Sequence, residues 1–67
     1  MIELQVNGEP RKVADDATVA DLLAEMNLPR EGVAVAVDRQ VIPRSKHADT
    51  RLEAGSRVEV LRAVGGG

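Results

Sequence analysis

The sequence predicts one α+β domain over residues 1–64, in which one helix covers a sheet of four to five strands. Apolar and polar residues alternate near the N-terminus with the period of a half-buried strand, and a later stretch repeats apolar residues with the period of a helix. Three valine-containing stretches of strand type follow that helix. A chain of 67 residues has room for a single thin core, so we expect one layer of sheet packed against one helix.

The first two strands form a predicted hairpin. Ile2, Leu4 and Val6 alternate with polar residues, so their side chains are expected on one face. Asn7-Gly8 follows, and both residues tolerate the positive φ that a two-residue hairpin turn requires. Residues 9–13 return along the first strand and contain a proline and two basic residues. These residues disfavour further strand pairing, so the return strand is expected at an edge of the sheet.

A helix is predicted to begin at Thr18. Its hydroxyl can accept a hydrogen bond from the first turn, and Asp21 stands three residues later, where an acidic side chain completes a capping box. Asn27 is suited to a left-handed C-terminal cap, and Pro29 cannot continue the helix. The apolar residues between these ends fall on one stripe, which we expect in the core: Val19, Leu22, Leu23 and Met26.

Two strands are expected directly after the helix. Residues 33–37 alternate Val with Ala, a pattern that allows close cover on both faces and predicts a central strand. A turn is expected at Asp38-Arg39, and it is followed by a short strand over residues 40–42 that Pro43 stops.

The last strand is expected over residues 57–64. Residues 44–50 are polar and predicted to be irregular, and Gly55 supplies a turn residue that tolerates positive φ. Along the last strand, alternation puts Val58 and Val60 on one face. The predicted order of elements is therefore strand, strand, helix, strand, strand, strand.

The residue types that are missing exclude several functions. Without Cys there is no disulfide, thiolate nucleophile or thiolate metal ligand, and a single His cannot form a zinc cluster. Without Phe, Tyr or Trp there is no ring on which a nucleic-acid base stacks, and the net charge of −2 disfavours phosphate binding. The longest apolar run, residues 33–37, is far shorter than the ~20 residues of a membrane span, and the N-terminus lacks the pattern of a signal peptide. We expect a small cytoplasmic protein that binds neither nucleic acid nor membrane, is not itself an enzyme, and acts through a partner.

Three glycines, Gly65, Gly66 and Gly67, end the sequence. They have no side chains to pack and the largest backbone entropy to lose, so a flexible tail is expected over residues 65–67. Such an end can be an incidental extension. An end without Cβ atoms can also pass through a narrow channel into an enzyme, where its carboxylate can attack the α-phosphate of ATP to form an acyl-adenylate.

Five stretches carry a family resemblance: Asn7-Gly8 and residues 18–23, 33–38, 41–44 and 60–67. The most specific of them contains Pro43-Arg44, at its distance from both the helix and the glycine end. Together they resemble the ThiS family, the sulfur carriers of thiamine biosynthesis. The resemblance implies a ubiquitin-like β-grasp fold, which is a mixed sheet of four to five strands covered by one helix.

Two positions differ from the family pattern. Members often have an aromatic residue, commonly Trp, three positions after the Pro-Arg pair, where this chain has His47. We expect His47 to be exposed and inert. The chain also ends in three glycines where two suffice, so Gly66 and Gly67 align with the family's diglycine and Gly65 is an additional flexible residue.

The resemblance implies a carrier whose reactive group is the carboxylate of Gly67. A ubiquitin-activating-like, ThiF-type adenylyltransferase would adenylate it, and a persulfide made from cysteine by a desulfurase would replace the adenylate with sulfur. The resulting thiocarboxylate would serve a ThiG-type thiazole synthase, with Gly65 and Gly66 supplying reach. The carrier itself would bind no cofactor or metal, because ATP and magnesium belong to the activating partner.

Three other functions stay open from the sequence. The small subunit of molybdopterin synthase resembles this chain in fold, tail and sulfur chemistry, although it is usually longer and commonly has aromatic residues. A ubiquitin-like modifier would be joined to lysines through Gly67 after the same adenylation. A plain binding module would carry an incidental glycine end.

The last strand has to bring the tail to a partner's active site. The alternation that buries Val58 and Val60 leaves Leu61 on the opposite face. Because the partner contact has to lie near the tail, we expect exposed apolar atoms at Leu61 and Val64 to form its centre, with Arg62 at its polar rim.

Overall fold

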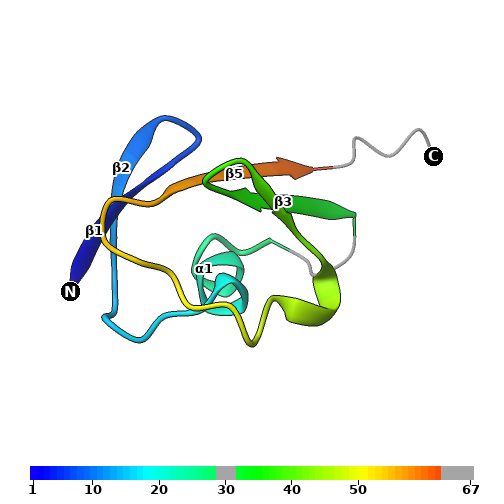
Figure 1. The fold of residues 1–67 in the computed structure, drawn as a ribbon, viewed down its shortest axis with the longest axis horizontal. Coiled ribbons are helices and arrows are strands. Elements are labelled where there is room, and N and C mark those ends of the chain that lie inside the picture. The colour runs from blue at the N-terminus through cyan, green and yellow to red at the C-terminus, as the bar shows by residue number, and fades with distance from the viewer. Residues whose placement is uncertain (29–31, 63–67) are drawn as a thin grey trace.

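The computed structural model describes residues 1–28 and 32–62, and its elements follow the predicted order (Figure 1). They are β1 (Ile2–Val6), β2 (Glu9–Val13), α1 (Val19–Glu25), β3 (Val33–Val37), β4 (Gln40–Ile42), the 3₁₀ helix η1 (Arg44–Lys46) and β5 (Arg57–Arg62). The one addition is η1, which lies in the segment that was expected to be irregular.

The five strands form one mixed sheet in the order β2-β1-β5-β3-β4, with α1 on one face (Figure 1). β1 and β5 run parallel, and the other neighbouring pairs are antiparallel. The predicted mixed sheet with one helix is confirmed, and so is the edge position of β2. β3 is paired on both sides, but the middle strand of the sheet is β5, because the chain returns to pair β5 with β1.

Two tight turns connect antiparallel strands where the sequence predicts them. Asn7 and Gly8 join β1 to β2 with φ values of 53° and 82°, and Asp38 and Arg39 join β3 to β4 with φ values of 50° and 71°. Two consecutive left-handed residues match the twist of the strands on either side. Gly55 also has a positive φ, of 81°, as expected before β5.

The capping box predicted at the start of α1 is present. The main-chain N–H of Asp21 donates to Thr18 Oγ1 at 3.2 Å, and the N–H of Thr18 donates to Asp21 Oδ2 at 3.0 Å. Asn27 follows the helix with a φ of 57°, the left-handed conformation predicted for it. Pro29, which was expected to stop the helix, lies outside the described residues.

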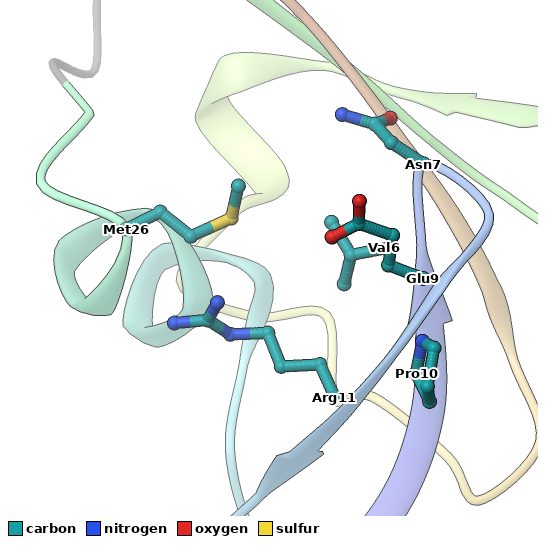
Figure 2. A pocket seen from close by; sticks show the side chains of 6 residues that line it. All are labelled: Val6, Asn7, Glu9, Pro10, Arg11 and Met26. Atoms are coloured by element: carbon teal, nitrogen blue, oxygen red, sulfur yellow. The ribbon is translucent and has the colours of Figure 1, made fainter.

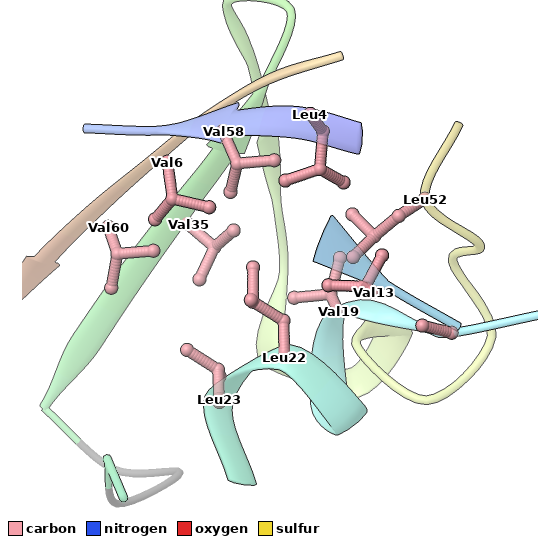
Figure 3. Packing of buried hydrophobic residues seen from close by; sticks show 11 residues of the cluster. Leu4, Val6, Val13, Val19, Leu22, Leu23, Val35, Leu52, Val58 and Val60 are labelled. Atoms are coloured by element: carbon pink, nitrogen blue, oxygen red, sulfur yellow. The ribbon is translucent and has the colours of Figure 1, made fainter. Parts of the chain in front are cut away.

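The apolar stripe of α1 packs against the sheet to form the core (Figure 3). Val19, Leu22 and Leu23 are buried as predicted, and Met26 is half-buried at the margin of the core. The buried apolar residues are Leu4, Val6, Val13, Ala17, Val19, Leu22, Leu23, Val35, Leu52, Val58 and Val60. The core therefore joins α1 to β1, β3 and β5.

The other face of the sheet is open. Ala34 is exposed and Ala36 is half-buried, whereas Val35 between them is buried. The expectation that β3 is covered closely on both faces is therefore wrong. Among the described residues α1 is the only α-helix, and it covers the valine side of β3.

His47 is buried, with 4% of its surface exposed, which corrects the expectation of an exposed and inert side chain. Its Nε2 donates to the carbonyl oxygen of Ile42 at 3.1 Å, and its own carbonyl accepts from the N–H of Ala20 at 3.1 Å. The ring therefore binds the end of β4, and the main chain binds the first turn of α1. Burial of this ring depends on contacts between separate segments, which composition does not reveal.

We expect His47→Ala to lower the free energy of unfolding by about 1–3 kcal/mol, because it removes a buried ring and leaves the Ile42 carbonyl without its donor. His47→Phe restores the ring but not the donor, so it should recover only part of the loss. Urea titration followed by far-ultraviolet circular dichroism measures both variants. An unchanged midpoint in His47→Ala would mean that the ring contributes nothing to the fold.

Candidate functional site

The candidate site begins at the end of β5, the last described segment before the glycines of the sequence (Figure 1). Leu61 is 67% exposed and Arg62 is exposed, so both are accessible to a partner as predicted. The valines of β5 are buried on the other face, which confirms the alternation. Val64 and residues 65–67 lie outside the described residues, and their roles stay predictions.

Leu61 belongs to an apolar patch on the open face of the sheet. It lies opposite Ala34 of β3, and Val41 of β4 lies opposite Ala36 of the same strand. The alanine side chains are short, so Leu61 and Val41, which are 67% and 71% exposed, stand above them. We call these four residues the open-face patch. Exposed apolar side chains that gather on one face make this patch a candidate surface for contact with another protein.

Sequence reasoning predicted Leu61 but missed the other three members of the open-face patch, of which Val41 is the large exposed one. The signal was present, because alternation within residues 40–42 puts Val41 on the face opposite to Ile42. Its position beside Ala36 follows from the two-residue turn at Asp38-Arg39, which fixes the register of β4 on β3. The sequence does not specify the pairing of β3 with β5, which brings Leu61 to the same patch. Charged residues border the patch, with Arg62 following Leu61 and Glu59 opposite Ala36.

A hollow of about 220 Å³ lies between the β1–β2 hairpin and the end of α1 (Figure 2). Glu9 and Arg11 of β2 line it together with Met26, and Nε of Arg11 is buried without a hydrogen-bond partner among the described residues. A charge that points inward from an edge strand opposes pairing with another strand. Glu9 and Arg11 carry opposite charges, so these two side chains give the hollow no net charge that would hold an ion.

The rest of the described surface has no metal-ligand cluster and has a further hollow. Within the described ranges, no group of three or more His, Asp or Glu side chains is arranged to hold a metal ion. A second hollow, of about 310 Å³ at the start of β5, is lined by two acidic and two basic residues: Asp38, Arg39, Arg57 and Glu59.

None of the helices within residues 1–28 and 32–62 has the length and the apolar character of a membrane span.

Comparison with known proteins decides the family. The sequence model of the ThiS family matches residues 4–67, which is nearly the whole chain. This chain belongs to the ThiS family. The crystal structure of the thiamine biosynthesis protein ThiS from Geobacter metallireducens superposes with a TM-score of 0.83 and 33% sequence identity, over 98% of this chain and 100% of that chain. The fold of this ThiS-family chain is accordingly the β-grasp that the sequence predicts.

Two curated relatives are also similar to this ThiS-family chain. The sulfur carrier protein ThiS of Escherichia coli is 24% identical over 66 residues, which cover 98% of this chain and 100% of that protein. A thiazole synthase of Paramagnetospirillum magneticum is 32% identical over 66 residues, which cover 98% of this chain and 20% of the synthase. The chain therefore spans about one fifth of the length of that synthase.

Proposed function

We propose that this ThiS-family chain is a sulfur carrier for thiazole formation in thiamine biosynthesis, with the carboxylate of Gly67 as its reactive group. The observation that carries the proposal is the extent of the family match, which runs from residue 4 to residue 67 and so includes the three terminal glycines. The exposure of Leu61 supports it, because β5 presents an apolar contact six residues before that carboxylate.

The proposed chemistry takes place on the main chain. A carboxylate oxygen of Gly67 attacks the α-phosphorus of ATP, an acyl-adenylate forms, and pyrophosphate leaves. The terminal sulfur of a persulfide then attacks the acyl carbon, and AMP leaves. A thiol cleaves the sulfur–sulfur bond, which forms a disulfide and releases the thiocarboxylate. Because this chain has no Cys, its partners supply the persulfide and the thiol.

The proposed partners follow from these steps. A ThiF-type adenylyltransferase binds ATP and magnesium and performs the first step, so the carrier needs no cofactor of its own. A cysteine desulfurase is the source of the persulfide, and a ThiG-type thiazole synthase accepts the sulfur. A segment similar to this chain forms part of a thiazole synthase, which supports the last assignment. A carrier joined to an enzyme in one polypeptide reaches it at a high effective concentration.

The small subunit of molybdopterin synthase and a ubiquitin-like modifier would use the same adenylate. The family match and the thiazole synthase relative both favour the thiamine pathway. Deletion of the gene tests this choice, and a growth requirement for thiazole is the expected result. A requirement for molybdenum cofactor instead, or the loss of high-mass conjugates from cell extracts, would contradict the proposal.

We expect Leu61→Asp to raise the KM for the carrier in adenylation by roughly tenfold or more, because it puts a charge into the open-face patch. Leu61 is exposed, so the stability of the fold should change little. Ala24→Asp is the control. It introduces the same charge on the exposed side of α1, and α1 covers the face of the sheet that is opposite to the open-face patch. Identical kinetics for both variants would place the partner contact elsewhere.

A further inference from the structure

β1 ends where its neighbour β5 still continues. The last main-chain bond of the parallel ladder between them runs from the N–H of Asn7 to the carbonyl of Val58 at 2.8 Å. At Asn7 the chain turns back, and Glu9 pairs with Val6 in the hairpin. The main-chain groups of Val60 therefore face an edge that the main chain of β1 no longer covers.

The side chain of Asn7 takes the place of that missing main chain. Its Oδ1 accepts from the N–H of Val60 at 2.8 Å, and its Nδ2 donates to the carbonyl of Val60 at 3.3 Å. In a continued parallel ladder, the carbonyl of residue 7 and the N–H of residue 9 would make these two bonds. A side-chain amide carries the same acceptor and donor as a peptide group, so one side chain replaces both.

Asn is well suited to this position for two independent reasons. Asn7 has a φ of 53°, and Asn adopts this left-handed conformation more readily than other residues except Gly. Gly would fit the turn but has no amide. Asp would keep the acceptor but lose the donor, and its carboxylate would face the carbonyl of Val60. Asn therefore satisfies the turn and also makes both bonds to Val60, which together we call the Asn7 clamp.

The Asn7 clamp binds Val60, the residue that precedes Leu61 of the candidate site in the sequence. β3 borders the other side of β5 at this level, with Val35 opposite Val60, so β5 lies here between β3 on one edge and the Asn7 side chain on the other. Leu61 of the open-face patch is the next residue. A strand end that loses its bonds on one edge frays, and a partner then has to order it again on docking, which weakens binding.

We propose that Asn7 is a positioning residue for sulfur loading: its side-chain amide holds the end of β5, so that Leu61 is presented to the activating enzyme in one orientation. This inference rests on the proposed function of the Gly67 carboxylate. Asn7 contacts neither the nucleotide nor the reacting carbon, and its effect is carried by β5.

The matched variants Asn7→Gly and Asp38→Gly test the proposal. Asp38 also stands in a two-residue turn with positive φ, and its Oδ1 accepts from the N–H of Arg57 at 3.0 Å, at the other end of β5. Each substitution keeps its turn and removes a side-chain contact to β5. Only Asn7→Gly should raise the KM for the carrier with a ThiF-type adenylyltransferase, by roughly fivefold to tenfold with kcat retained, the factor that one or two lost hydrogen bonds produce.

Amide hydrogen exchange of the free carrier provides a second readout. Asn7→Gly should accelerate exchange at the N–H of Val60, and Asp38→Gly should accelerate it at the N–H of Arg57. An equal rise in KM for both variants would reduce Asn7 to a structural role, and unchanged exchange at Val60 would overturn the clamp itself. If the wild-type chain is not adenylated, the proposed function fails, and hydrogen exchange still decides whether Asn7 clamps β5.

Discussion

Shortening the chain by one glycine should lower the rate of thiocarboxylate formation by roughly 100-fold or more. The terminal carboxylate would lie one residue, about 3.5 Å, short of its place beside the α-phosphate. Positioned reactions lose rate steeply when a reacting atom is displaced by as little as ~1 Å. The three glycines are adjacent, so removal of any one of them gives the same chain, which keeps a terminal diglycine but brings its carboxylate one residue closer to β5 along the sequence.

Substitutions separate the length of the tail from its residue types. Gly65→Ala keeps the length and adds one methyl group at the residue that is additional to the family's diglycine, so most of the activity should remain. Gly67→Val also keeps the length, but it places a stiff β-branched side chain beside the reacting carbon, so activity should be lost. Gly65→Ala is therefore the control for both changes.

Sulfur loading can be measured on the intact carrier. The chain is incubated with a ThiF-type adenylyltransferase, ATP, magnesium and a persulfide donor, and mass spectrometry follows the exchange of one terminal oxygen for sulfur. Fragmentation should place the sulfur of the wild-type chain on Gly67. Full loading of the shortened chain would show that the distance from β5 to the carboxylate is not critical, and the assigned role of Gly67 would be wrong.

The parts of the fold that depend on neighbouring residues were predictable. The turn at Asn7-Gly8 and the capping box of Thr18 and Asp21 each involve residues at most three positions apart, so both partners of each interaction stand in one short stretch. The exposure of Leu61 followed in the same way from the alternation along β5. These local signals were sufficient for the order of elements and for part of the candidate site.

The parts that depend on contacts between distant segments were not predictable. His47 is buried because its segment lies against α1 and the end of β4. Val41 and Leu61 come to one patch only because β3 pairs with β5, which places Ala34 opposite Leu61. The Asn7 clamp joins residues that are 53 positions apart, so a residue predicted as part of a turn also holds the last strand. Such contacts follow from the strand order, which places β5 between β1 and β3.

Leu22→Ala should lower the free energy of unfolding by about 2–5 kcal/mol, because truncation of a buried Leu removes apolar contacts and leaves a cavity. Leu22 is 0% exposed and points from α1 toward the sheet (Figure 3). A domain of 67 residues has a total stability of about 3–10 kcal/mol, so this one substitution removes a large share of it.

Leu61→Ala makes the same chemical change at a side chain that is 67% exposed, and its stability should change by less than about 0.5 kcal/mol. Urea titrations of both variants are followed by far-ultraviolet circular dichroism, because the chain has no Trp or Tyr for fluorescence. An unchanged midpoint for Leu22→Ala would contradict the assignment of the α1 stripe to the core.

Leu22 and Leu61 lie on opposite sides of the sheet, so Leu22→Ala should still load sulfur at temperatures where it is folded. Leu61→Ala should keep its stability and raise the KM for adenylation, because its side chain lies in the open-face patch that we propose as the partner contact.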